Sequence, residues 1–177
     1  MSRFPLEMFA SLELNHVAFP KTGRVISQTP LGEEFTAEAP CENGMWVSAS
    51  VADGTVHSVE AATDAVGIVY TAEKEYDMNH YGLKTFGRKI AGDYPRVGIL
   101  SVGDTVTTNC LDLGEFSDVA AVETALAAGA VYVVPVVGSA VPKLTATATT
   151  EGACGRVIKI YTVPNGEKGV KYEMIRV

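Results

Sequence analysis

Few residues in this sequence are spaced for catalysis. Its three histidines, His16, His57 and His80, fall in an N-terminal segment, a strand-like segment and a charged loop. An activated nucleophile needs a base beside it, and the base needs a third group to orient it. None of the histidines lies in such a motif, and we expect His57 on the solvent face of a hairpin. The sequence therefore predicts no catalytic residue, and we expect that the chain is not an enzyme.

The cysteines are also scattered. Cys41, Cys110 and Cys154 are odd in number and far apart, which argues against a disulfide framework and favours folding in a reducing compartment. Cys110 follows Thr-Thr-Asn at the end of a predicted strand, where a thiolate would be a candidate nucleophile. Free cysteine is among the most buried residue types, so we predict core packing for this side chain.

No metal site is predicted. The sequence has no close pair of cysteine or histidine ligands, and the loop from Glu73 to His80 mixes both charges. A calcium loop places Asp or Asn at alternate positions around a glycine, whereas here only Asp77 and Asn79 alternate. We interpret this segment as a solvated loop.

No cofactor site is predicted either. No helix begins after Gly98 or Gly103 to bind a phosphate with its N-terminal amides. Trp46, the single tryptophan, is expected to anchor the core and not to form a ligand platform.

The overall charge restricts the partners. The 177 residues carry a formal net charge of −7, and no cluster of lysine and arginine offsets it. An acidic surface repels phosphate backbones and anionic lipids, so we expect neither nucleic-acid nor membrane binding. The most apolar run, from Gly129 to Val141, is too short to span a bilayer, and the N-terminal residues lack the apolar block of a signal peptide.

Residues 1–40 are predicted to form an extended arm or peripheral strands. From Phe4 onward, apolar residues occupy every second position, as on one face of a strand. Pro20 and Gly23 then argue against helix in the remainder of the segment. The arm either adds a strand to the sheet of a partner or completes the protein's own sheet. The candidate interface residues in the first case are Phe4, Leu6, Met8, Phe9 and Leu12.

Residues 41–177 are predicted to form a single β-rich domain of short strands separated by turns. Asp53-Gly54 suits a tight hairpin turn, Pro135 suits a strand edge or bulge, and Pro164 to Gly166 suit the turn of a C-terminal hairpin. Such frequent turns are typical of a mainly β fold with a minor α+β character, a compact antiparallel β-barrel or sandwich.

One helix is predicted, over residues 117–128. Ser117 or Asp118 is placed to cap its first N–H groups, and Gly129 is placed to end it in the left-handed conformation. Most of the remaining residues are alanine, so this helix can lie close to a sheet.

Two glycines stand in the middle of predicted strands. Gly67 is flanked by Val66 and Ile68, and Gly98 by Val97 and Ile99. Glycine in a strand interior costs roughly 0.5–1 kcal/mol relative to alanine. We therefore predict that both are structural glycines in one curved sheet, at bends where a neighbouring strand, or the helix over 117–128, approaches too closely for a Cβ.

The segment "TAEAPCENGMWVSASVADGTVHSVEAATDAVGIVYTAEK" resembles the central part of the lambda-type head decoration proteins and other tailed-phage capsid cement proteins. The order of features is similar over residues 36–110 and more loosely over 117–177, although this chain is longer and has the added helix. The resemblance implies a small β-rich, β-tulip-like homo-oligomer, a trimer in that family, without enzymatic activity. It also implies assembly in the host cytoplasm and binding to the major capsid protein on the outer surface of the virion, where the subunit would cement the head.

Two other interpretations remain open. A tail-tube or tail-associated subunit is also β-rich, and the loop over residues 72–82 would then contact the next ring. A carbohydrate-binding module or small enzyme would use Trp46, His57 or His80.

Overall fold

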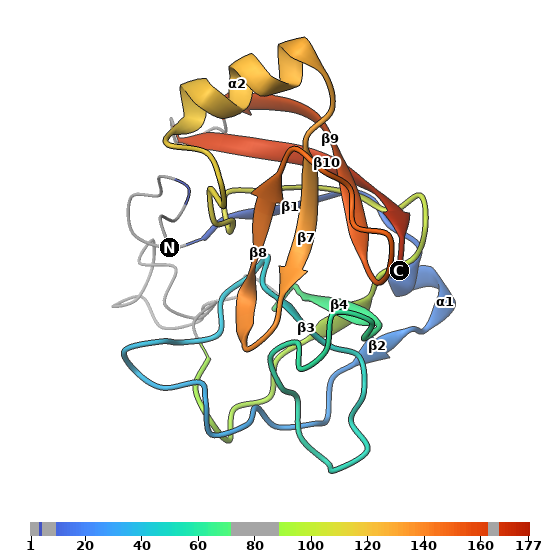
Figure 1. Ribbon diagram of the computed structural model, residues 1–177. Coiled ribbons are helices and arrows are strands. Elements are labelled where there is room, and N and C mark those ends of the chain that lie inside the picture. The colour runs from blue at the N-terminus through green and yellow to red at the C-terminus, as the bar shows by residue number, and fades with distance from the viewer. Residues whose placement is uncertain (1–3, 5–9, 72–88, 163–166) are drawn as a thin grey trace.

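The protein folds into two antiparallel β-sheets, seen in a computed structural model that describes residues 4, 10–71, 89–162 and 167–177 (Figure 1). The larger sheet has the order β1 (Leu12–His16), β6 (Thr105–Thr108), β10 (Lys168–Arg176), β9 (Cys154–Thr162), β7 (Tyr132–Val136) and β8 (Ser139–Thr145). The smaller sheet has the order β2 (Val25–Ile26), β5 (Val97–Ile99), β4 (Val66–Val69) and β3 (Trp46–Ser48). The predicted mainly β class is confirmed. The two sheets do not close into a barrel, so of the two predicted architectures the fold is the sandwich-like one.

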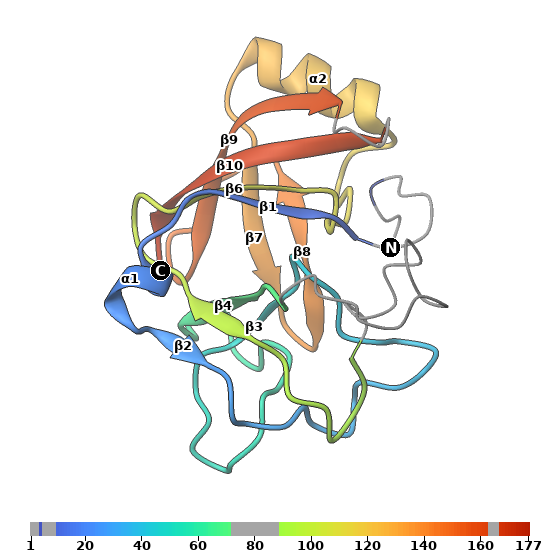
Figure 2. The same cartoon turned by 180° about the vertical axis from the view of Figure 1, so that it is seen from behind.

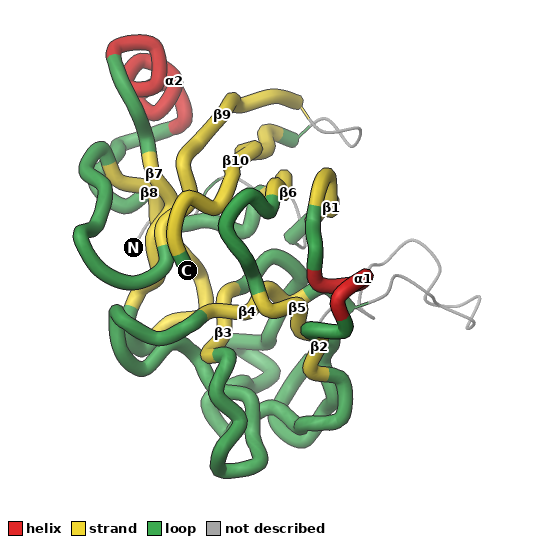
Figure 3. Tube along the Cα trace, turned by 90° about the vertical axis from the view of Figure 1, so that its right-hand side faces the viewer, coloured by secondary structure: helices red, strands yellow, loops and turns green. Residues whose placement is uncertain are grey.

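The smaller sheet is covered on both faces. Figure 3 shows it between the six-stranded sheet and a layer of loops. All four residues of β4 are buried, which explains the unbroken apolar run in the sequence. Val66 and Ile68 belong to the core between the sheets, and Val69 belongs to a second core beneath them, with Leu31 and Phe35 from the loops.

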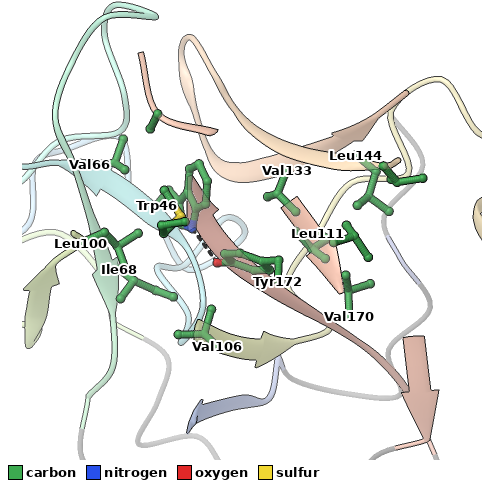
Figure 4. Close-up of a cluster of buried hydrophobic side chains, with 14 of the residues drawn as sticks. Trp46, Val66, Ile68, Leu100, Val106, Leu111, Val133, Leu144, Val170 and Tyr172 are labelled. Atoms are coloured by element: carbon green, nitrogen blue, oxygen red, sulfur yellow. Dashed lines mark hydrogen bonds between the residues drawn. The ribbon is translucent and has the colours of Figure 1, made fainter. Parts of the chain in front are cut away.

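The core between the sheets contains the largest buried side chains (Figure 4). Alternate residues of β10 point into it, namely Val170, Tyr172 and Met174. Trp46 of β3 meets Tyr172 from the opposite sheet, so this aromatic pair joins the two layers.

The paired glycines lie side by side in the smaller sheet. β4 and β5 pair antiparallel, with Ile68 opposite Gly98 and no register shift at either glycine. A Cβ on Gly67 would lie 2.4 Å from Val97 Cγ1, and a Cβ on Gly98 would lie 2.3 Å from the Phe19 ring. Both glycines thus stand where a neighbouring side chain occupies the space of a Cβ.

The predicted helix over 117–128 is confirmed as α2 (Val119–Ala128), and Asp118 caps it by accepting a hydrogen bond from Ala121 N–H. Two details of the prediction are wrong. Gly129 is extended, with φ of −172°, and does not take the left-handed conformation. The helix packs beside β9 of the larger sheet and does not cover the glycines.

A short helix that the sequence did not predict lies against Gly98 instead. It is α1 (Phe19–Thr22), with Pro20 in its first turn and Gly23 at φ of 71° after its last residue. Proline fits the first turn of a helix because those N–H groups have no partner within the helix, so our prediction from Pro20 and Gly23 was wrong. Neither α1 nor α2, the helices of the described residues, is long and apolar enough to cross a membrane.

The N-terminal segment supplies one edge strand to each sheet. β1 pairs with β6, and β2 pairs with β5. Phe4 is fully buried in the core between the sheets, and its N–H bonds to the Leu111 carbonyl oxygen. Leu12 lies opposite Thr108 in the larger sheet. These contacts favour the alternative in which the arm completes the protein's own sheet, whereas Leu6, Met8 and Phe9 lie outside the described residues.

The C-terminal half contains two hairpins. β9 and β10 form the predicted C-terminal hairpin, whose turn at residues 163–166 lies outside the described residues. β7 and β8 form the other, and the register shifts between Val134 and Val136, so Pro135 lies at a bulge as predicted. The loop over residues 72–82, which includes His80, lies entirely outside the described residues.

Candidate functional site

The loop layer brings His57 against two carboxylates. The segment 56–58 lies between residues 30–32 and the edge of β3 that does not pair with β4. On one side, Gly32 N–H bonds to the Val56 carbonyl oxygen at 3.0 Å. On the other, Ser48 N–H at the end of β3 bonds to the His57 carbonyl oxygen at 2.9 Å. This strip of backbone fixes the position of the imidazole.

Both nitrogens of the His57 ring have an acidic partner. Nδ1 lies 3.0 Å from Glu34 Oε1, and Nε2 lies 2.8 Å from Asp53 Oδ2. The Thr55 hydroxyl is 2.5 Å from Nε2, and Glu34 Oε1 also accepts a hydrogen bond from Ser58 N–H. The result is a carboxylate–histidine cluster formed by Glu34, Asp53, Thr55 and His57.

Two glycines allow this cluster to form. Gly54 has φ of 84° and turns the chain, and Asp53 Oδ1 accepts a hydrogen bond from Thr55 N–H. The predicted tight hairpin is not formed, because Val47 of β3 bridges Ser58 across a longer loop and Val56 bridges Leu31. A Cβ on Gly32 would lie 2.3 Å from Glu34 Oε2 and 2.7 Å from the His57 ring. The missing side chain at position 32 therefore leaves room for Glu34 to reach the imidazole.

Each charged group of the cluster stabilises the charged form of its neighbour. Partial burial opposes protonation of His57, but hydrogen bonds to Asp53 and Glu34 outweigh it and raise the pKa of the imidazole. Partial burial opposes ionisation of Glu34, but hydrogen bonds from its own N–H, Ser58 N–H and His57 lower its pKa. Hydrogen bonds from Thr55 N–H and from His57 lower the pKa of Asp53. The cluster therefore favours the imidazolium more than water favours it for an isolated histidine.

This state is poorly suited to catalysis. Thr55, His57 and Glu34 follow the hydroxyl–imidazole–carboxylate order of a hydrolase triad, in which the imidazole takes the hydroxyl proton. Here the Asp53 carboxylate also lies 2.8 Å from Nε2 and competes with the hydroxyl for that nitrogen. A carboxylate can only accept, so its contact favours a proton on Nε2 and opposes a role as base. The geometry is that of a clamp between two segments of chain.

The other residues considered from the sequence are dispersed. All three cysteines are buried, and burial raises the pKa of the Cys41 thiol, which keeps it protonated. Trp46 is fully buried and presents no face to a ligand. His16 is exposed on the edge strand β1. Among the described residues, no group of three or more histidine, cysteine, aspartate or glutamate side chains is arranged to hold a metal ion.

A second candidate site is the outward face of the β9–β10 hairpin, which the sequence analysis missed. Val170, Tyr172 and Met174 point into the core, so Lys171, Glu173 and Ile175 point outward. Figure 2 shows β9, β10, β6 and β1 following one another on this side of the molecule.

Apolar side chains gather on this face. Of the eight large apolar side chains exposed among the described residues, four lie on or beside it: Val102, Ile158, Ile175 and Val177. Ile158 is the extra residue of a bulge, and Val102 adjoins the end of β10 because Gly103 N–H bonds to the Met174 carbonyl oxygen. Single exposed apolar residues are ordinary, whereas a group of them marks a contact surface.

The same face carries basic residues in an acidic protein. Lys159 lies directly opposite Lys171, a like-charge pair that destabilises a sheet in the absence of a counter-charge. Arg156 lies opposite Glu173, and the Lys159 ammonium lies 4.9 Å from the centre of the Tyr161 ring.

We define the β9–β10 face as Val102, Arg156, Ile158, Lys159, Lys171, Glu173, Ile175 and Val177. Alternation along β10 could have indicated its outward residues, but the apposition of Lys159 and Lys171 depends on the register.

Comparison of the chain with protein-family models, curated proteins and solved structures finds no match.

Proposed function

We propose that the protein is a virion structural subunit, a capsid decoration or cement protein that binds the major capsid protein and strengthens the head. The sequence resemblance over residues 36–110 suggests the class. The observation that carries a binding role is the β9–β10 face, where Ile158, Ile175 and Val177 are exposed beside the like-charged pair Lys159 and Lys171.

The proposed mechanism is the bridging of neighbouring capsid subunits. The aliphatic side chains of the β9–β10 face would be buried at the contact, and Lys159 and Lys171 would meet carboxylates of the partner, which relieves their mutual repulsion. A specific contact needs roughly 1,000 Å² of buried surface or more. Many symmetry-related copies then resist rupture of the shell together, because each attachment raises the effective concentration of the next.

The test is the position and copy number of the chain in intact particles, measured by cryo-electron microscopy. A lattice of subunits on the outer capsid surface supports the proposal. A stacked six-fold ring would support a tail-tube subunit instead, and absence from the particles would refute a virion role.

Surface variants test whether the β9–β10 face makes the contact. We expect Ile175→Glu to lower particle occupancy strongly, because the substitution places a charge in the apolar part of the face. Val137→Glu is the matched control, since Val137 is 57% exposed in the β7–β8 turn, outside this face. Equal occupancy of the two variants, with unchanged melting, would exclude this face as the capsid contact.

An enzymatic role is tested separately with the carboxylate–histidine cluster. A hydrolase that uses Thr55 and His57 would lose its activity in both Thr55→Ala and His57→Ala. We expect no hydrolysis of ester or glycoside substrates by the unmodified protein, because the Asp53 carboxylate competes with the Thr55 hydroxyl for Nε2.

A further inference from the structure

The carboxylate–histidine cluster has no part in the proposed capsid contact, and its position in the fold suggests another role. His57 belongs to the segment 56–58 that covers the outer edge of β3, the last strand of the smaller sheet. Val47 of β3 forms a bridge with Ser58, and Val56 forms a bridge with Leu31 on the opposite side. Any contact that fixes the position of His57 therefore also keeps segment 56–58 in place along the edge of β3.

The hydrogen bonds of His57 depend on its protonation. A neutral imidazole has one N–H donor and one acceptor nitrogen, whereas the imidazolium has two donors. Because Glu34 and Asp53 lie on opposite nitrogens, only the imidazolium can donate to both carboxylates. Loss of the proton leaves one carboxylate against a nitrogen lone pair.

We propose that His57 is a pH-sensitive latch, in which the imidazolium ties the Asp53 turn to Glu34 and so holds segment 56–58 over the edge of β3. The charged groups that act on the ring are Glu34 from the loop after Gly32 and Asp53 from the turn before it. Deprotonation loosens this tie. The Ser48 N–H then loses its partner more often, and an uncovered strand edge can pair with a strand from another chain.

The latch operates in a defined pH window. The raised pKa of His57 stabilises the closed state fully below the unfolded value of 6.5, and this contribution is lost as the pH rises through the folded pKa. The lowered pKa of Glu34 stabilises the closed state above the unfolded value of 4.5, and this contribution is lost as the pH falls through the folded pKa. Closure is therefore strongest between these limits and weakens toward alkaline pH.

Two NMR measurements on the full chain test the latch. The first is the titration of the His57 ring protons, which should have a midpoint above that of the same residue in urea-unfolded protein. The second is hydrogen exchange of the Ser48 and Ser58 amides, corrected for the intrinsic effect of pH on exchange. We expect their protection to fall roughly twofold to fivefold as His57 loses its proton, the range for a partly exposed ion pair.

Variants separate the latch from general effects of pH. Glu34→Gln and His57→Gln should lower the protection at pH 6 and remove its dependence on pH over the range in which His57 of the unmodified protein titrates. Glu38→Gln and His16→Gln change exposed side chains elsewhere. These control variants should retain the amide protection at pH 6 and its dependence on pH. The proposal is overturned if Ser48 protection in the unmodified protein is constant through the His57 titration, or if His57 titrates as it does in the unfolded chain.

Discussion

The indole N–H of Trp46 donates a hydrogen bond of 2.9 Å to the hydroxyl oxygen of Tyr172, and both side chains are fully buried. The two rings meet edge to face, with centroids 5.9 Å apart (Figure 4). Trp46 comes from β3 and Tyr172 from β10, so one polar contact inside the core joins the two sheets. Burial of the Tyr172 hydroxyl raises its pKa, although the hydrogen bond from Trp46 opposes the shift, and the group stays neutral.

Removal of this acceptor should destabilise the protein. We expect Tyr172→Phe to lower the free energy of unfolding by about 1–3 kcal/mol, because the Trp46 N–H is left buried without a partner. Urea denaturation followed by Trp46 fluorescence measures the change. Tyr132→Phe is the control, since Tyr132 is only partly buried, and a loss as large in the control would contradict this account.

Filling the space at the strand glycines should also be costly. We expect Gly98→Ala to lose about 1–3 kcal/mol by overpacking against Phe19, and Gly67→Ala a similar amount against Val97. The valine variants should be worse. Gly129→Ala is the control, because its backbone is extended and no atom lies within 4 Å of the added Cβ. Equal and small changes in melting temperature at all three positions would show that neither strand glycine is needed for packing.

The N-terminal segment should be required for folding. We expect Phe4→Ala to cost about 3–5 kcal/mol, since it empties a fully buried site in the core. Deletion of residues 2–14 should lower the melting temperature further, because it also removes most of β1 from the edge of β6. Leu14→Ala, at a side chain that is 38% exposed, should change stability far less. Unchanged melting of the deletion variant would instead support an arm that serves only to bind a partner.

Removal of the Asp118 cap of α2 should destabilise the protein less than removal of the Phe4 side chain. We expect Asp118→Ala to cost about 0.5–2 kcal/mol, because the Ala121 N–H at the start of the helix loses its acceptor. Differential scanning calorimetry would measure the shift, and Asp118→Asn should restore most of the loss because asparagine is also a good cap. A melting temperature of D118N as low as that of D118A would indicate that the charge, and not the hydrogen bond, stabilises the helix.

Several elements were determined by local sequence. The alanine-rich run after Asp118 forms α2, Pro135 lies at a bulge, and the segments around Gly67 and Gly98 form β4 and β5. In each case the signal is a property of neighbouring residues, such as a capping side chain, a missing N–H or a buried apolar run. Those properties act within a few residues, so they can be recognised without knowledge of the fold.

Tertiary structure alone decided which strands pair and what their residues face. β1 pairs with β6 across a wide separation in sequence, and Phe19 packs on Gly98, because burial of apolar surface selects the sheet order among many locally acceptable ones. The same holds for both candidate sites. Glu34 and His57 meet through the bridge between Leu31 and Val56, and the β9–β10 face depends on a register that sets Lys159 against Lys171. The sequence alone determines the residue types and their alternation along each strand. The contacts between Glu34 and His57 and between Lys159 and Lys171 depend on strand pairing and register, which only the folded chain defines.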